Sequence, residues 1–294
     1  MTLVVFLVAS LIGGANVGLV KFGVLQFPPI VLVAARAILA AIIIFPFLNK
    51  QKVLTLRIFN KDLMLTGILF AANWIFFAFG VQHTSAIMSQ VIYVPTALLV
   101  AILGYFLLKE KLTKNQIIGL VVTITGMTIL IISSFRTKDI LSFGTPLGNF
   151  LIVLGLFSWS FYIVLSRKIS QKYSPLTILF FDFIITAAFA LVLLPIQLIL
   201  KPIDSNLITF EGIMSVFALA LFSSAAFFFL YQWLIKHTSA FISSLLIYPV
   251  TVVSALIGLI LFNESINTIL ISGALLTMVG VFYSTGANYI KKWI

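Results

Sequence analysis

The chain has 294 residues, of which 62% are hydrophobic and only 9% are charged. Soluble domains are about half apolar and about a quarter charged, so this composition excludes an ordinary soluble protein and indicates an integral membrane protein. The net charge of +11 could attract nucleic acid, but membrane topology accounts for it, and we expect no nucleic-acid partner. The absence of cysteine excludes disulfides, thiolate metal sites and cysteine nucleophiles.

A transmembrane helix needs about 20 predominantly apolar residues, and ten segments of the chain satisfy this requirement. The first starts at the N-terminus without the basic region of a cleavable signal peptide, so we expect it to remain as a helix. The apolar runs are continuous, which excludes a membrane β-barrel, whose strands alternate over about ten residues. In chain order the predicted spans are 3–22, 27–48, 62–82, 86–108, 115–134, 148–166, 174–199, 211–234, 240–262 and 267–287.

The second half of the chain repeats the first at a constant step of 154 residues. His83-Thr84-Ser85-Ala86 returns as His237-Thr238-Ser239-Ala240, and several single residues return at the same step. The pairs are Pro95 and Pro249, Gly104 and Gly258, Glu110 and Glu264, Gly119 and Gly273, and Gly126 and Gly280. Each repeat holds five predicted spans, an odd number, so the second repeat enters the membrane from the opposite face. The sequence therefore predicts an all-α membrane protein with two inverted five-helix repeats around a central cavity, an arrangement that recurs in secondary transporters.

Lysines and arginines predict the orientation of these spans. With a cytoplasmic N-terminus, three of them, Arg136, Lys138 and Lys201, lie in outer loops and thirteen lie in inner loops. The inner ones are Lys50, Lys52, Arg57, Lys61, Lys109, Lys111, Lys114, Arg167, Lys168, Lys172, Lys236, Lys291 and Lys292. This bias follows the positive-inside rule, so we predict a multi-pass protein of the inner (cytoplasmic) membrane with both termini in the cytoplasm.

Several motifs of the first repeat resemble those of one transporter family. They are Leu11-Ile12-Gly13-Gly14-Ala15-Asn16 with Lys21, Ala34-Ala35-Arg36-Ala37, His83-Thr84-Ser85-Ala86 with Pro95, and Leu108-Lys109-Glu110-Lys111-Leu112 with Gly119 and Gly126. Together they resemble the EamA domain of the drug/metabolite transporter superfamily, and the second repeat, from Ser158-Trp159 through Arg167 to Gly280, is similar to it. The resemblance covers nearly the whole chain and implies a ten-helix carrier that moves small metabolites, often amino acids outward, by alternating access.

The resemblance also divides the chain into units. We predict a first EamA-like repeat at 1–134, a connecting loop at 135–147, a second repeat at 148–287 and a cytoplasmic tail at 288–294. Around Glu264 the chain departs from the family pattern, because Asn263 and Ser265-Ile266-Asn267 replace the common basic or apolar neighbours.

Two ionisable residues fall inside predicted spans, where such groups are costly and are candidates for function. Arg36 lies in the second span and Asp182 in the seventh, at nearly equivalent positions when the N-terminal parts of the repeats are aligned at a step of 146 residues. Arg36 could anchor a carboxylate or phosphate of the substrate, and Asp182 could bind an ammonium group or carry a coupling proton. The alternative is that the two neutralise each other or local backbone groups, or that Arg36 extends to a membrane surface.

Polar and aromatic side chains in other spans are further candidates for the lining of a substrate cavity. The step of 146 residues pairs Asn16 with Tyr162 and Gly13 with Trp159, a small residue with a large one in each case. Close helix packing through Gly14 and Gly18 is the alternative for this region. The remaining candidates are Asn73, Trp74, Gln90, Tyr93, Tyr231 and Tyr248, each of which could instead be an ordinary packing residue.

The repeated prolines and glutamates are predicted to have structural roles. Pro95 and Pro249 should bend the fourth and ninth spans, because proline removes a backbone hydrogen bond, and the bends could act as hinges or shape the cavity. The Thr-Ser pairs that follow both histidines should cap the next helices. Glu110 and Glu264 are predicted to be helix caps or partners of a helix dipole rather than ligands of the substrate.

These features predict a secondary transporter that moves a small organic metabolite, an amino acid or a related compound, outward across the cytoplasmic membrane. The alternative is a carrier for uptake or exchange of a nucleoside-like, cofactor or phosphorylated metabolite. A channel is a further alternative, whereas an enzyme is not predicted, because the chain has no His-Glu-x-x-His, Gly-x-Ser-x-Gly or Gly-x-Gly-Asp motif. We expect no cofactor and no metal, and a monomer or weak dimer whose partners are the substrate and the lipid bilayer.

Overall fold

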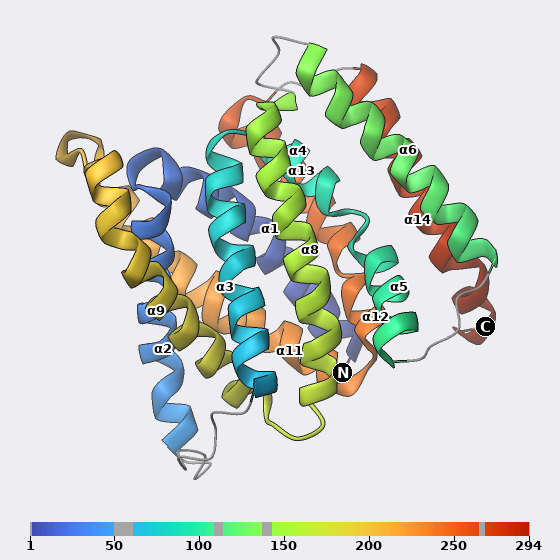
Figure 1. Ribbon diagram of the computed structural model, residues 1–294, viewed down its shortest axis with the longest axis horizontal. Coiled ribbons are helices and arrows are strands. Elements are labelled where there is room, and N and C mark those ends of the chain that lie inside the picture. Colours follow the sequence, from blue (N-terminus) through green and yellow to red (C-terminus); the bar gives the residue numbers. More distant parts are fainter. Residues whose placement is uncertain (1, 50–60, 109–113, 137–142, 265–267, 294) are drawn as a thin grey trace.

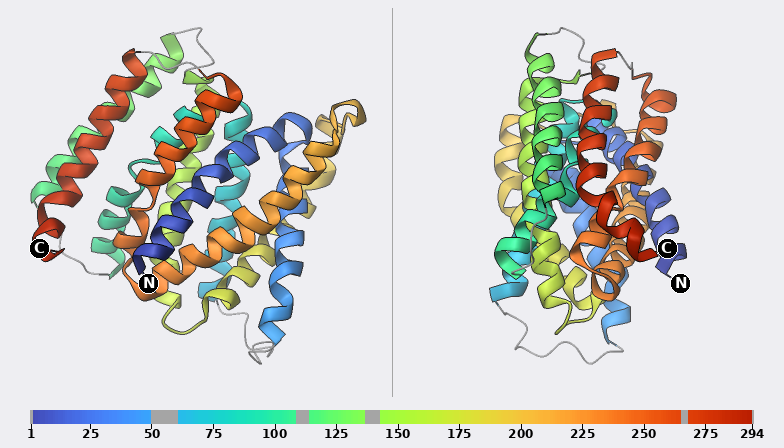
Figure 2. Two further views of the ribbon diagram at one scale, coloured as in Figure 1. Left: turned by 180° about the vertical axis from the view of Figure 1, so that it is seen from behind. Right: turned by 90° about the vertical axis from the view of Figure 1, so that its right-hand side faces the viewer.

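The computed structural model is all-helical over the residues that it describes, which are 2–49, 61–108, 114–136, 143–264 and 268–293. Long helices lie side by side and consecutive ones run in opposite directions (Figure 1), and both chain ends lie toward the same end of the bundle (Figure 2). The elements are α1 (Thr2–Gln26), α2 (Pro29–Asn49), α3 (Lys61–Gln82), α4 (Ala86–Tyr93), α5 (Thr96–Leu108), α6 (Lys114–Arg136), α8 (Pro146–Ile169), α9 (Pro175–Leu200), the short 3-10 helix η2 (Ser205–Leu207), α10 (Phe210–Ala218), the π-helix η3 (Leu219–Ala226), α11 (Phe227–His237), α12 (Ala240–Ser244), α13 (Ile247–Phe262) and α14 (Thr268–Trp293).

Eight helical segments are long and apolar enough to cross a membrane, as judged by length and composition. They are Thr2–Gln26, Pro29–Leu48, Lys61–Gln82, Ala86–Leu107, Pro146–Ile169, Pro175–Leu200, Phe210–His237 and Ala240–Phe262. The other two predicted spans fall on α6 and α14, whose apolar stretches, Val121–Leu130 and Thr268–Gly280, are shorter. The all-helical membrane fold is therefore confirmed, whereas the count of ten spans in two inverted repeats stays a prediction.

The last helix extends beyond the last predicted span, 267–287. α14 continues to Trp293, through most of the segment 288–294 for which the sequence predicts a tail. The polar residues near its end do not stop the helix, because neither proline nor glycine follows Gly286.

Large apolar side chains are exposed on the outside of the bundle. On α9, for example, Val192 is 74%, Ile199 is 80% and Leu200 is 78% exposed. A contiguous apolar surface of this kind is rare on soluble proteins, and it suits contact with lipid chains.

The helices of the two halves pack against each other. α3 packs on α8, α2 on α9 and α1 on α13, so each of these pairs joins a helix of the first half to one of the second. The contact of α1 with α13 is close because glycines face α13: a Cβ at Gly14 would collide with Val253, and one at Gly18 would lie 2.5 Å from Ile257. Gly14 and Gly18 therefore serve helix packing, the alternative that the sequence left open.

The repeated glycines of the last span in each half meet one another. α6 and α14 lie side by side at the edge of the bundle (Figure 1). A Cβ at Gly126 would lie 2.9 Å from the carbonyl oxygen of Gly273, and a Cβ at Gly280 would lie 2.8 Å from that of Gly119. Small residues allow helix backbones to approach closely in membranes, which explains why Gly126 and Gly280 are glycines.

Two of the predicted spans are broken near their prolines. The first consists of α4 and α5, which separate at Val94 and Pro95. The second consists of α12 and α13, which separate at Leu245 and Leu246, so that Pro249 lies in the first turn of α13. Proline cannot donate to the carbonyl four residues earlier, and here the carbonyl of Leu245 accepts from the N–H of Tyr248 instead (3.2 Å).

Serine side chains start both broken spans. Ser85 Oγ accepts a hydrogen bond from the N–H of Met88 (2.9 Å), and Ser239 Oγ accepts one from the N–H of Ile242 (3.0 Å). These bonds satisfy N–H groups that have no partner inside the helix. The short helices α4 and α12 therefore each begin at a fixed residue, which sets the position of the side chains that follow.

Candidate functional site

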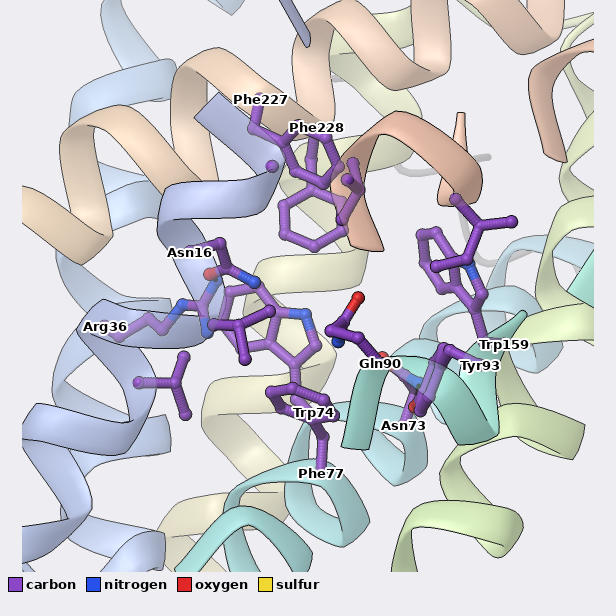
Figure 3. Close-up of a pocket in the computed structure, with 15 residues that line it drawn as sticks. Asn16, Arg36, Asn73, Trp74, Phe77, Gln90, Tyr93, Trp159, Phe227 and Phe228 are labelled. Carbon is purple, nitrogen blue, oxygen red and sulfur yellow. Dashed lines mark hydrogen bonds between the residues drawn. The ribbon is translucent and has the colours of Figure 1, made fainter. Parts of the chain in front are cut away.

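A pocket of about 600 Å³, a volume that includes its mouth, lies between the two halves of the bundle. Its lining comes from α1, α2, α3 and α4 of the first half and from α8, α11 and α13 of the second (Figure 3). The lining residues are Gly13, Asn16, Val17, Val20, Arg36, Asn73, Trp74, Phe77, Gln90, Tyr93, Trp159, Phe227, Phe228, Ile247 and Val250. Most of this wall is apolar or aromatic, with a few polar groups, as is usual for sites that bind small molecules.

Arg36 is the charged residue of the pocket lining, and the fold holds it in place from three sides. Its Nη2 donates to Asn16 Oδ1 on α1 (3.0 Å), and its Nε donates to Ser224 Oγ in η3 (2.8 Å). Its guanidinium group lies over the indole ring of Trp74, with Cζ 3.7 Å from the ring centroid. Arg36 is only 5% exposed, so it points into the protein and does not extend to a membrane surface.

No carboxylate neutralises Arg36 within the described part of the chain. Asn16 and Ser224 are neutral, and the ion pair that the described residues form joins Lys21 to Glu264. Nη1 has no protein partner among the described residues. A buried charge without a counter-charge is unfavourable, and the guanidinium is therefore suited to bind an anionic group that enters the pocket.

The π-helix explains how a serine reaches Arg36. Within η3, Ser224 Oγ also donates to the carbonyl of Leu219, five residues earlier (2.8 Å). A π-helix places one more residue in the turn than an α-helix does, and such turns are frequent at functional sites. Ser224 was not among the residues predicted from the sequence, because serines in an apolar span carry no signal of a wider helical turn.

Two further polar groups face the centre of the pocket. The indole Nε1 of Trp74 is buried and has no hydrogen-bond partner among the described residues. Gln90 extends from α4 toward Trp74, between the Arg36 side and the Tyr93 side of the pocket (Figure 3). Buried donors normally have a partner, so both side chains are positioned to bond to a ligand.

The opposite side of the pocket is formed by Asn73, Tyr93 and Trp159 (Figure 3). Asn73 Nδ2 donates to Tyr93 Oη (2.6 Å) and to the carbonyl of Gly155 (3.0 Å). A Cβ at Gly155 would lie 2.6 Å from Tyr93 Oη, so glycine is needed there for the tyrosine to fit. These bonds fix α3, α4 and α8 relative to one another at this side.

Aromatic rings form a continuous layer around the pocket. Trp159 stacks on Tyr162 with ring centroids 5.0 Å apart and planes 20° apart, and it also contacts Phe228 and Tyr231. Phe70 packs against Trp74 at a centroid distance of 4.9 Å. Each contact of this kind adds about 0.5–1.5 kcal/mol beyond the burial of area, so this layer holds Trp74 and Trp159 in fixed orientations.

The predicted cavity residues thus separate into two groups. Asn16, Arg36, Asn73, Trp74, Gln90, Tyr93 and Trp159 line the pocket, whereas Tyr162, Asp182, Tyr231 and Tyr248 are not part of its lining. Tyr162 and Asp182 contact each other, with Tyr162 Oη donating to Asp182 Oδ2 (2.7 Å). Arg36 and Asp182 have different partners among the described residues, so these two residues do not form an ion pair with each other.

Glu264 caps a helix, although not the helix that follows it in the chain. Its Oε1 accepts from the N–H of Ala86 (2.6 Å) and its Oε2 from the N–H of Ile87 (2.9 Å), at the start of α4. Lys21 Nζ donates to Glu264 Oε1 (2.7 Å) and to the carbonyl of Thr84 (3.0 Å). Negative charge is favourable at a helix N-terminus, and this contact joins the ends of α1, α4 and α13.

The chain around Glu264 is built to make this contact. Asn263 ends α13 in the left-handed conformation with φ 49°, which asparagine tolerates better than most residues. Gly258 leaves room for the carboxylate, since a Cβ there would lie 2.6 Å from Glu264 Oε2. Its repeat partner Glu110, for which the sequence predicts a similar role, lies outside the described residues.

Known transporters are similar to this chain over nearly its whole length. The EamA-like transporter family matches residues 1–132 and 146–286. The uncharacterized transporter YyaM of Bacillus subtilis (strain 168) is 28% identical over 97% of this chain and 93% of its own length. A probable amino-acid metabolite efflux pump of Salmonella typhimurium is 25% identical over 97% of this chain and 95% of its own length. A solved crystal structure shares the fold with a TM-score of 0.70 and 17% identity, over 99% of this chain and 98% of that one.

Proposed function

The chain belongs to the EamA-like transporter family, and we propose that it moves a small carboxylate-bearing metabolite, an amino acid or a related compound, out of the cell by alternating access. It is a multi-pass membrane transporter, as its family and its relatives indicate. The proposal adds the class of substrate, the direction of transport and the mechanism.

The observation that supports an anionic substrate is the unpaired Arg36. It is buried in the pocket without a carboxylate among the described residues, and its guanidinium offers donors in a fixed plane. A planar fork of donors matches a carboxylate or a phosphate. The aromatic wall of the pocket favours a substrate with an apolar part, as in many amino acids.

We propose a position in the pocket for each part of such a substrate. Its carboxylate would bind Arg36, beside Asn16 and the indole N–H of Trp74. Its apolar part would contact Trp159 and the other rings of the wall, and the amide of Gln90 would bond to a polar group between them. Binding through a few oriented polar groups and a large apolar contact is common for small molecules.

Alternating access requires that the pocket opens to each side in turn. We infer that ten helices in two inverted repeats provide this movement, because inverted repeats commonly move against each other in secondary transporters. The contact of Lys21, Glu264 and the start of α4 would hold one end of the bundle closed. Its atoms come from both halves of the chain, so a movement of the halves would break it.

Export rather than uptake is supported by the relative from Salmonella typhimurium, which is named as a probable amino-acid metabolite efflux pump. A carrier of phosphorylated or nucleoside-like metabolites is the second candidate, because the guanidinium of Arg36 also suits a phosphate. The two candidates differ in the ligands that should stabilise the purified protein.

The test is a thermal-shift screen of purified protein with amino acids, nucleosides, cofactors and sugar phosphates, followed by counterflow in liposomes. A ligand that binds the native state raises the apparent melting temperature, and we expect this from carboxylate ligands and not from their amides. Counterflow should saturate with concentration. Stabilisation by phosphate compounds alone would favour the second candidate, and flux without counterflow would indicate a channel.

A further inference from the structure

A second buried polar cluster lies behind the aromatic wall of the pocket. It consists of Asp182 on α9, Tyr162 and Ser166 on α8 and Gln232 on α11, which we call the Asp182 network. Asp182, Tyr162 and Ser166 are 0% and Gln232 is 1% exposed. The bonds run in one direction: the Gln232 amide donates to Tyr162 Oη, and Tyr162 Oη donates to Asp182 Oδ2 (2.7 Å).

The carboxyl group of Asp182 is poorly bonded for an anion. Tyr162 is the one side chain that donates to it, and its Oδ1 has no partner among the described residues. An ionised carboxylate in a dry interior needs a counter-ion or several donors. The protonated acid, in contrast, carries no charge, and a buried O–H group without an acceptor costs far less than a buried carboxylate without a counter-ion.

Titratable groups on the neighbouring helices do not supply a counter-ion. α9 packs against α2, α3 and α11. On α2, Arg36 is bonded to Asn16 and Ser224, and on α3 the charged residues Lys61 and Asp62 lie at the start of the helix. On α11, Tyr231 lies against Trp159, and the last-turn residues Lys236 and His237 bond to the carbonyls of Tyr173 and Trp233. On α8, Arg167 bonds to the carbonyls of Ile235 and Lys236.

One aromatic layer connects the network to the pocket. Trp159 lines the pocket and also stacks on Tyr162, at a centroid distance of 5.0 Å. Trp159 therefore links the wall of the pocket to Tyr162, the donor of Asp182. The network also joins α8, α9 and α11 close to the turn between Ile169 and Pro175, whereas Lys21 and Glu264 join helices at the opposite end of α1 and α4.

We propose that Asp182 is a proton-binding site that couples transport to a proton gradient, a proposal that rests on the transport function inferred above. In the state described here the carboxyl group carries a proton. When α8, α9 and α11 separate and water reaches the network, the carboxylic acid releases one proton to solvent and becomes a carboxylate. That release occurs on one side of the membrane, and the carboxylate takes up one proton from the other side when the protein opens there, so each cycle moves one proton across; no other bond is made or broken.

Infrared spectroscopy tests the proton site without any substrate. Purified protein at neutral pH should show the C=O absorption of a protonated carboxyl group, and Asp182→Asn should lose it. The chain has only seven acidic residues, and Glu264→Gln, which changes another buried carboxyl, should keep the absorption. Tyr162→Phe should shift it, because the hydrogen bond to the carboxyl is lost, and this variant decides the question if Asp182→Asn does not fold. Wild-type protein without the absorption, or Asp182→Asn with it, would overturn the proposal.

Proteoliposomes test the coupling, with an equimolar mixture of radiolabelled L-amino acids as the probe. We expect the wild type to accumulate label when a pH gradient is imposed, and Asp182→Asn to lose this accumulation while it keeps counterflow, which needs no net proton movement. Accumulation that persists in Asp182→Asn, or a wild type with counterflow and no response to the gradient, would overturn the proposal. A wild type without counterflow would overturn the proposed substrate class, and the infrared absorption alone would then decide on the proton site.

Discussion

Arg36 and Asp182 occupy nearly equivalent positions in the two repeats, but the structure surrounds them differently. Arg36 lines the pocket, and its partners are an amide, a hydroxyl and an indole ring. Asp182 lies behind the aromatic wall and accepts a single hydrogen bond from a tyrosine. Nearly equivalent positions in the two repeats therefore have different surroundings: Arg36 lines the pocket, whereas Asp182 lies outside its lining.

The largest expected effect comes from removing the charge of Arg36. Arg36→Gln should weaken binding of a carboxylate ligand by about 2–4 kcal/mol, or about 30- to 1,000-fold, because a buried charged hydrogen bond is lost. Arg36→Lys should recover only part of the affinity, since an ammonium group lacks the planar fork. Isothermal titration of purified protein measures both values.

Asp182→Asn is the matched control for this comparison. It lies outside the pocket lining and resembles the protonated acid in shape, so equilibrium affinity at neutral pH should match that of the wild type. If both variants lost affinity to the same degree, the distinction between a ligand-binding charge and a proton-binding charge would be wrong.

The ion pair of Glu264 and Lys21 is a third charged site, and its charges are paired. Glu264→Gln should lower the free energy of unfolding by about 2–3 kcal/mol, because the carboxylate bonds to two N–H groups of α4 and to an ammonium group. Lys21→Gln should cost less, since Glu264 keeps its backbone donors. Unfolding in a titration with denaturing detergent measures the difference, and unchanged stability together with lost ligand affinity would place Glu264 in the binding site instead.

Trp74 is a second candidate for a hydrogen bond to the ligand, because its indole N–H has no partner among the described residues. Trp74→Phe should weaken ligand binding by about 1 kcal/mol, or about fivefold, through loss of one hydrogen bond, while an aromatic ring under Arg36 remains. Trp233→Phe is a suitable control, since Trp233 stacks on His237 near the end of α11 and is absent from the lining. Equal losses in both variants would mean that the indole acts through packing alone.

Much of the pocket could be predicted from the sequence. Arg36 and Trp74 are polar or bulky side chains near the centres of apolar spans, and Gln90 is a polar side chain near the start of another, where such residues are costly and usually serve a purpose. The rotation of each helix about its axis could not be predicted, because these spans are apolar on every side and have no polar face to indicate which side is inward. For this reason Tyr162 and Tyr93 looked alike in sequence, although only Tyr93 reaches the pocket.

Contacts between residues far apart in the chain also could not be predicted from the sequence. Glu264 was predicted to act at a helix end. Nothing in the sequence indicates that this helix is α4, because Ile87 of α4 lies 177 residues before Glu264. Ser224 was missed because its contact with Arg36 depends on the wide turn of η3. Both contacts arise from the way two halves pack together, which a pattern within one span does not contain.

The smallest effect is expected at Ser224, and its neighbour provides a matched control. Ser224→Ala removes the acceptor of Arg36 Nε, while Asn16 and Trp74 still hold the guanidinium, so ligand affinity should fall by only about 0.5–1 kcal/mol, or about two- to fivefold. Ser223 Oγ is buried with no partner among the described residues, so Ser223→Ala should leave affinity unchanged and stability unchanged or slightly higher. Titration and thermal unfolding of both variants measure this. A loss of affinity in Ser223→Ala equal to that in Ser224→Ala would show that the serines act by shaping η3, and that Arg36 does not depend on a particular hydroxyl for its orientation.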